Sequence, residues 1–373
     1  MKNEIYKYFF HEFARYFTIT LFALAIIVWT IQAVNFLDLV TEDGHAFAVY
    51  FLYSLLVLSK VLTKLIPFSF LIATILTILK LEKDNELIIL WTSGLNKIHI
   101  VNLILRISFI IMILQLILTT ILNPFLLNSS RTLLKNSELQ FIPSLLREKQ
   151  FNDTVESLTI FVDKKYEDGM YENIFIRDEG KILSDISDVS STIIAKNAYV
   201  SDDEKNLILL NGSIQKLAVD GSVTVVKFEK TVLNLYGIST KSISVPKIQE
   251  TSTIEILLCI KNKYQARNCD RHKKALMDTK IEINKRLGMP IFIPLIALIC
   301  CFLLASRRDK KNFYYNKYIY FFIGFVTLAA AEIAVRYSGA SSSHTTFYYL
   351  LPLTMFPLFY FFLIRTFKYE NLT

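Results

Sequence analysis

The chain has 373 residues, of which 53% are hydrophobic and only 20% are charged, and its formal net charge is +8. Such a composition excludes an ordinary soluble globular protein and is typical of a protein embedded in a membrane. The excess of Lys and Arg is informative through its position, because basic residues in short loops set the orientation of a membrane protein.

Six stretches are long and apolar enough to cross a bilayer, which takes about 20 residues as a helix. They cover residues 14–38, 48–79, 98–123, 286–305, 316–337 and 347–366. The first stretch is too long for a signal peptide and lacks a small-residue cleavage site, so we expect it to remain as a transmembrane helix. The sequence thus predicts three spans within 1–123, a polar insert at 124–285 and three spans within 286–373.

Basic residues concentrate in the loops on one side of these spans. The loop between the fourth and fifth spans carries Arg307, Arg308, Lys310, Lys311 and Lys317. The N-terminus carries Lys2, Lys7 and Arg15, and the C-terminus carries Arg365 and Lys368. The loops after the first and fifth spans contain no Lys or Arg. We therefore predict that both termini are cytoplasmic and that the insert, which follows an odd number of spans, is periplasmic.

The second span contains two lysines, Lys60 and Lys64, which lie four residues apart and therefore on one helix face. Helical rise places them about 18–24 Å from the outer end of the span. Charges at that depth usually face a cavity or a partner, because exposing them to lipid is costly. Lys64 could also pair with an acidic residue of a partner helix.

The cytoplasmic segment 80–97 is amphipathic. Asp84 or Asn85 can cap a short helix near 84–94 that Gly94 ends. Leu87, Leu90 and Trp91 then fall on one face, which predicts an exposed apolar surface. This surface fits either the groove of a partner protein or the lipid headgroups.

The insert is β-patterned between about 150 and 248, with helical flanks at 128–150 and 252–285. Its apolar runs are 158–162, 173–177, 191–195, 207–214, 223–229 and 232–236. Gly-containing pairs and triplets at 167–169, 178–180, 211–212 and 220–221 predict turns between them. Short strands at this spacing favour a sandwich, a jelly roll or an open barrel.

More charges lie at the outer ends of the later spans. Arg286 ends a basic stretch, 261–286, that is either a collar around a phosphate-bearing ligand or a solvated helix face. Glu332 and Arg336 have the spacing of an ion pair on one helix, and Arg336 could also reach the outer interface.

The four cysteines predict little chemistry. Cys300 and Cys301 lie inside the fourth span, where we expect apolar packing. Cys259 and Cys269 lie ten residues apart in an expected helix, roughly 15 Å by helical rise, so a disulfide would need a break in that helix and we favour free thiols.

Several kinds of site are absent from the sequence. It contains no G-x-x-x-x-G-K-[ST] phosphate loop and no G-x-S-x-G elbow, and its five histidines have no metal-binding spacing. We therefore predict no catalytic residue, no metal and no cofactor, and nothing in the sequence suggests a nucleic-acid partner.

Residues 85–95, N-E-L-I-I-L-W-T-S-G-L, resemble the E-L-x-x-L-x-x-S-G-[IL] coupling segment of the lipopolysaccharide export permeases. The three-plus-three layout with a β-insert resembles the architecture of that family along the whole chain. Residues 29–39, 157–162 and 284–290 resemble its F-type rather than its G-type subunit. Trp91 departs from the pattern, in which a smaller or charged residue is expected.

This resemblance implies one permease subunit of an ATP-driven exporter in the bacterial inner membrane. It would pair with a G-type subunit and with a dimer of a separate cytoplasmic ATPase. Glu86, Leu87, Leu90, Trp91 and Gly94 would then form the ATPase-coupling segment. The insert would be a jelly roll whose apolar groove passes acyl chains to a periplasmic bridge of similar jelly rolls.

The resemblance also implies an anionic lipid as substrate. Lys60, Lys64, Arg286 and Arg336 are then candidate ligands for the phosphates or core sugars of lipopolysaccharide. Two alternatives remain open: a permease subunit that moves another lipid or a lipoprotein, and a membrane scaffold or sensor that transports nothing. Co-purification of an ATPase would separate the scaffold from the permeases, and the identity of the bound lipid would separate the two permeases.

Overall fold

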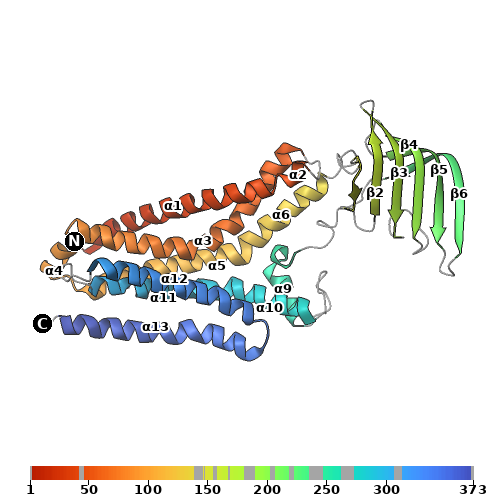
Figure 1. Ribbon diagram of the computed structural model, residues 1–373. Coiled ribbons are helices and arrows are strands. Elements are labelled where there is room, and N and C mark those ends of the chain that lie inside the picture. Colours follow the sequence, from red (N-terminus) through yellow and green to blue (C-terminus); the bar gives the residue numbers. More distant parts are fainter. Residues whose placement is uncertain are drawn as a thin grey trace. The chain divides into compact units, whose positions relative to one another are not determined.

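The computed structural model describes the chain over residues 2–41, 46–137, 146, 148–153, 158–166, 169–179, 190–201, 206–217, 222–234, 247–261, 273–305 and 313–370. Within these ranges, six helical segments are long and apolar enough to cross a membrane. A six-stranded antiparallel sheet lies between the third and the fourth of them in the sequence (Figure 1). The predicted class, a six-helix membrane protein with an inserted all-β domain, is confirmed.

All of the spans except the fifth are longer than the apolar stretches that predicted them, because their helices continue past the apolar part. The third span extends to Lys135 and the fourth begins at Lys274. The helices are α1 (Lys2–Asn35), α2 (Asp38–Thr41), α3 (Phe47–Lys83), α4 (Glu86–Thr92), α5 (Lys97–Ile117), α6 (Asn123–Asn136), α9 (Thr253–Ile260), α10 (Lys273–Gly288), α11 (Phe292–Cys301), α12 (Phe313–Tyr337) and α13 (Ser342–Glu370).

Two compact units make up the chain. One contains Met1–Ile31, Val57–Leu127 and Lys247–Thr373, and the other contains Gln32–Leu56 and Asn128–Pro246. In the first unit α11 packs against α5, α12 and α13. Every residue of α11 is buried, as expected of the central helix of a bundle.

The third span changes its helical geometry near its outer end. Residues Leu118–Leu122 form a π-helical turn between α5 and α6, and a short 3-10 turn at Ile248–Glu250 begins the chain segment that follows the sheet. π-helical turns are rare and often lie at functional sites. Both turns contribute to the site described below.

The sheet is a meander in which each strand pairs with its neighbours in the sequence. The strands are β1 (Phe151–Asn152), β2 (Leu158–Lys165), β3 (Met170–Asp178), β4 (Ser191–Val200), β5 (Asn206–Leu217) and β6 (Val223–Asn234). Alternate residues of β2, such as Leu158, Ile160 and Val162, are buried in one cluster with residues of the neighbouring strands. This alternation is the signature of a sheet with one covered face.

Two details of the predicted strand pattern are wrong. The runs 223–229 and 232–236 belong largely to one strand, β6, because Lys230 and Thr231 continue its pairing with β5. Asn211 and Gly212 form no turn and lie inside β5. Asn211 has a positive φ of 53°, and a Cβ at Gly212 would overlap the carbonyl of Ile194, so these residues accommodate a local kink and a close strand contact.

The turn expected at 167–169 is supported by Gly169, which has a φ of 80° and donates its N–H to the carbonyl of Tyr166, and residues 167 and 168 lie outside the described residues. The expected turn at 220–221 and the basic residues 307–311 lie outside the described residues.

The helical flank after the sheet is not continuous. α9 ends at Ile260 and α10 begins at Lys273. Cys259 is disulfide-bonded, whereas Cys300 and Cys301 are free and buried. The preference for a free thiol at Cys259 was therefore wrong, because it assumed one helix through the segment. The remaining cysteine, Cys269, lies outside the described residues.

Candidate functional site

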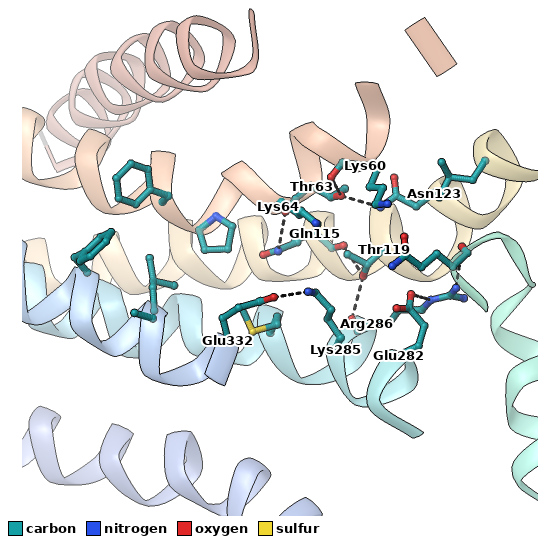
Figure 2. A pocket seen from close by; sticks show the side chains of 18 residues that line it. Lys60, Thr63, Lys64, Gln115, Thr119, Asn123, Glu282, Lys285, Arg286 and Glu332 are labelled. Carbon is teal, nitrogen blue, oxygen red and sulfur yellow. Dashed lines mark hydrogen bonds and ion pairs between the residues drawn. The ribbon is translucent and has the colours of Figure 1, made fainter. Parts of the chain in front are cut away.

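A cavity of about 390 Å³ lies in the membrane unit among α3, the π-helical turn, α10 and α12 (Figure 2). Its polar lining residues are Lys60, Thr63, Lys64, Gln115, Thr119, Asn123, Gln249, Glu282, Lys285, Arg286 and Glu332. Its apolar side includes Phe68, Phe325 and Leu328. A concave site with a mostly apolar wall and a few convergent charges is the usual form of a ligand pocket.

Three of the four predicted substrate ligands come together in this cavity. Lys60, Lys64 and Arg286 line it, whereas Arg336 is exposed and does not. The lining contains four basic residues and two acidic ones. The cavity is therefore cationic, as the depth and sign of the two lysines predict.

Lys60 and Lys64 have no carboxylate partner among the described residues, although both sit in a span that is otherwise apolar. Lys60 is half-buried and Lys64 is exposed to the cavity. Because unpaired charges at membrane depth are costly, such residues usually serve a ligand or an ion pathway. These two ammonium groups are thus available to an anion.

Arg286, by contrast, is fully engaged by the protein. Its side chain is 3% exposed. Nε donates to Glu282 at 2.9 Å, and the two terminal nitrogens donate to the Thr253 hydroxyl and to three carbonyls, those of Thr251, Ile248 and Gln249. These bonds use the five N–H groups that a guanidinium has, so the expectation that Arg286 holds substrate is not met by its geometry.

What Arg286 does hold is the segment that follows the sheet. Residues 248–253 contain the 3-10 turn and the start of α9, and Arg286 fixes their carbonyls against α10. The hydroxyl of Thr253 also donates to the carbonyl of Thr120 in the π-helical turn, at 2.6 Å. Arg286 is therefore a positioning residue at the end of the cavity.

The expected pair of Glu332 with Arg336 is also replaced by a different partner. Glu332 forms its ion pair with Lys285 of α10. Helical spacing allows both arrangements, but α10 lies beside α12 and brings an ammonium group to the cavity side. Lys285, which the sequence analysis did not single out, thus neutralises one of the two acids of the lining.

The motif at 284–290 gains a structural explanation from its neighbours. The Asn284 amide donates to the hydroxyl of Ser338 at 2.9 Å. A Cβ at Gly288 would overlap the ring of Tyr348. Asn284, Lys285, Arg286 and Gly288 therefore each fix α10 to a different part of the membrane unit.

The third span supplies polar residues that the sequence analysis missed. Gln115, Thr119 and Asn123 follow one another at intervals of four and all line the cavity. The Thr119 hydroxyl contacts the carbonyl of Arg286 at 3.0 Å. Polar residues at this spacing in an apolar span were the signal that could have identified them.

The cytoplasmic coupling segment forms the short helix α4, but its buried and exposed faces differ from the prediction. Leu87 is buried, and Leu90 and Trp91 pack against the same core of the membrane unit. Ile88 and Ile89 are the exposed residues, at 50% and 63%. The sequence could not choose between the two faces, because both of them are apolar.

The ends of α4 are fixed by contacts with other helices. The Tyr8 hydroxyl of α1 donates to Oε1 of Glu86 at 2.9 Å. The ammonium group of Lys97 lies 5.8 Å from the ring centroid of Trp91 and 5.5 Å from that of Phe367 in α13. These cation–π contacts give Trp91 a role within the subunit.

The predicted caps of α4 are partly wrong. Asn85 precedes the helix but has a positive φ of 60° and makes no side-chain capping bond. Gly94, which follows the C-terminal end, has a φ of 84°, as expected for a residue that ends a helix.

Among the described residues, no group of three His, Cys, Asp or Glu side chains could hold a metal ion.

Comparison with known proteins identifies the family. The sequence matches the family described as "Lipopolysaccharide export system permease LptF/LptG" over residues 7–366. RP871, an uncharacterized protein of Rickettsia prowazekii (strain Madrid E), is 28% identical over 239 residues, which cover 63% of this chain and 64% of that protein. The match thus spans less than two thirds of the relative. Because the family match covers nearly the whole chain, the protein belongs to the LptF/LptG family of lipopolysaccharide export permeases and is a multi-pass inner-membrane protein.

Proposed function

We propose that this protein is the F-type permease subunit of a lipopolysaccharide exporter and that its cationic cavity receives part of the phosphorylated headgroup. The observation that carries the proposal is the pair Lys60 and Lys64, which face a membrane-embedded cavity without a carboxylate partner among the described residues. An anionic headgroup would satisfy both ammonium groups. The apolar side of the cavity, with Phe68 and Phe325, suits the adjoining lipid.

The protein itself is a non-catalytic subunit in this proposal. A separate cytoplasmic ATPase dimer hydrolyses ATP, and α4 transmits its movement to the membrane unit. The exposed residues Ile88 and Ile89 contact the ATPase, whereas Glu86, Leu87, Leu90 and Trp91 connect α4 to the rest of the unit. The docking role predicted for Leu87 and Leu90 is thus moved to the opposite face of the same helix.

The remaining parts of the assembly follow from the family. A G-type subunit completes the membrane core, and the β-domain passes lipid to a periplasmic jelly-roll bridge. Both termini are cytoplasmic and the β-domain is periplasmic. The loop charges support this orientation, as does the disulfide at Cys259, since disulfides persist outside the reducing cytoplasm.

Site-specific photocrosslinking to lipopolysaccharide tests the substrate. A crosslinker at position 60 or 64 should capture lipopolysaccharide, and Lys60→Glu combined with Lys64→Glu should weaken its binding at least about tenfold, because each charge-assisted contact contributes roughly 1.5–3 kcal/mol. Arg336→Glu is the matched control, since Arg336 is exposed outside the cavity.

Absence of crosslinks at both lysines, with normal binding by the double reversal, would contradict the proposal. Mass spectrometry of the lipid that co-purifies with the complex adds an independent outcome. A different lipid, or a lipoprotein, as the main bound species would replace lipopolysaccharide as the substrate.

A further inference from the structure

Two amide side chains of the third span present acceptors that no described residue satisfies. Gln115 is 3% exposed and Asn123 is half-buried, and both line the cavity. The carbonyl oxygens Oε1 of Gln115 and Oδ1 of Asn123 are buried and have no hydrogen-bond partner among the described residues. Buried acceptors of this kind are uncommon and call for an explanation.

Thr63 fixes the orientation of both amides. Gln115 Nε2 donates to the main-chain carbonyl of Thr63 at 3.2 Å, and Asn123 Nδ2 donates to the Thr63 hydroxyl oxygen at 2.7 Å (Figure 2). The Thr63 hydroxyl donates its own proton to a carbonyl of the preceding turn, that of Ser59 or Lys60. In this arrangement its oxygen accepts from Asn123.

The orientation of the Gln115 amide is fixed, because turning it would bring its carbonyl against the carbonyl of Thr63. In this structure the Asn123 amide donates to the Thr63 hydroxyl oxygen. Both NH2 groups are thus committed to α3, and both carbonyl oxygens remain as acceptors beside the cavity. With no donor from a described residue, these acceptors are served by whatever fills the cavity, which is water when the cavity is empty and a ligand when it is occupied.

The cavity also limits what kind of donor enters it. Lys60 and Lys64 lie on the α3 side, three residues before and one residue after Thr63. They attract a phosphate and repel a second cation, such as the ammonium group of an ethanolamine headgroup. A fully ionised phosphate offers no donor of its own. A ligand that suits both the lysines of α3 and the amide carbonyls of the third span is therefore an anion that also carries neutral donors, namely hydroxyl or amide N–H groups.

We propose that Gln115 and Asn123 accept hydrogen bonds from the sugar hydroxyl or amide N–H groups next to the phosphate and so select a phosphorylated amino sugar over a simple phospholipid headgroup. This inference rests on the proposed function, in which Lys60 and Lys64 take the phosphate. It adds the selection step, because a site built to accept a hydrogen bond rejects a ligand that lacks the donor.

The test uses the full-length chain in the complex with which it co-purifies, in phosphatidylcholine nanodiscs. Two phosphate-bearing probes are compared: monophosphoryl lipid A, whose phosphate sits on an acylated glucosamine, and phosphatidic acid, whose phosphate has no neutral donor beside it. The variants are Gln115→Met and Asn123→Leu. Asn102→Leu is the matched control, an amide of the same span that accepts from the Tyr360 hydroxyl at 3.3 Å outside the cavity.

We expect the wild type to prefer lipid A by roughly tenfold or more. Each cavity variant should weaken lipid A binding about fivefold and leave phosphatidic acid binding unchanged, and Asn102→Leu should bind both probes as the wild type does. If Gln115→Met does not assemble, Asn123→Leu carries the test, since Asn123 is less buried.

The outcomes separate the two proposals. A wild type that binds neither probe overturns the proposed function. A wild type that prefers lipid A, with variants that keep this preference, overturns the inference and leaves the function standing. Equal weakening of both probes means that the amides only position the lysines, and this result also overturns the inference.

Discussion

Two walls of one cavity carry basic side chains, and they use them in different ways. On α3, Lys60 and Lys64 have no carboxylate partner among the described residues. On α10, Lys285 pairs with Glu332, and Arg286 makes hydrogen bonds with all of its N–H groups. The sign of the charge is the same on both walls, so sign alone does not identify a substrate ligand. The partners of each group distinguish the wall that can bind from the wall that holds the structure together.

The largest effect should come from the α10 wall. Arg286→Ala leaves Glu282 without its partner and leaves three carbonyls of the 248–253 segment without a donor. Removing one member of a buried pair typically costs about 3–5 kcal/mol. We therefore expect a large fall in the thermal midpoint of the purified protein and in its abundance in the membrane.

Lys60→Met is the control for this prediction. It removes a cation that has no carboxylate partner within the described ranges, and it should leave the thermal midpoint unchanged or raise it, because ligand-binding groups are often held at a cost in stability. The distinction between the walls would be lost if Arg286→Ala folded normally and failed only to bind lipid.

A similar distinction applies to the two faces of α4 at the cytoplasmic end. Ile88→Asp with Ile89→Asp should release the ATPase while the permease remains folded, since truncating an interface anchor typically costs on the order of 2 kcal/mol or more. Leu87→Ala should instead lower stability by about 2–5 kcal/mol, because Leu87 is 5% exposed within the core. Co-purification of the ATPase and thermal unfolding measure the two effects separately.

The opposite result would restore the face predicted from the sequence. If the Ile88 and Ile89 variant retained the ATPase while Leu87→Ala released it from a stable permease, Leu87 would become accessible in the assembled complex.

The features that could be predicted from the sequence depend on local patterns. Six spans and an all-β insert follow from runs of apolar residues and from alternation, which the chain itself carries. The cavity lysines were found because a charge in an apolar span stands out. Gln115 and Asn123 were missed because single amides are common in helices and their significance depends on Thr63, more than 50 residues away.

The sequence could not predict which residues pair with one another in ion pairs and hydrogen bonds. Glu332 had a plausible partner one helical turn away in Arg336, yet it pairs with Lys285, 47 residues away. Arg286 was assigned to substrate because its acceptors are mostly main-chain carbonyls, which leave no trace in residue identity. The break after Ile260 was missed for a related reason, since helical periodicity does not reveal a constraint such as the disulfide at Cys259.

The smallest effect on stability and binding should come from removing the carboxylate partner of one cation on α10, so that this cation resembles the two lysines of α3. Glu332→Gln removes the partner of Lys285 and leaves a second potential anion ligand in the cavity lining. The side chains of the pair are 30% and 38% exposed, so solvent screens their attraction and its loss should cost only about 0.2–1 kcal/mol of stability.

Phosphatidic acid binding should tighten roughly twofold to fivefold, and more at low salt than at high salt, because the Debye length falls as salt is added. Arg336→Gln, which changes an exposed charge outside the cavity, should leave binding unaltered. Weaker binding by Glu332→Gln would mean that Glu332 positions Lys285 for the ligand, and the α10 wall would then belong to the binding site after all.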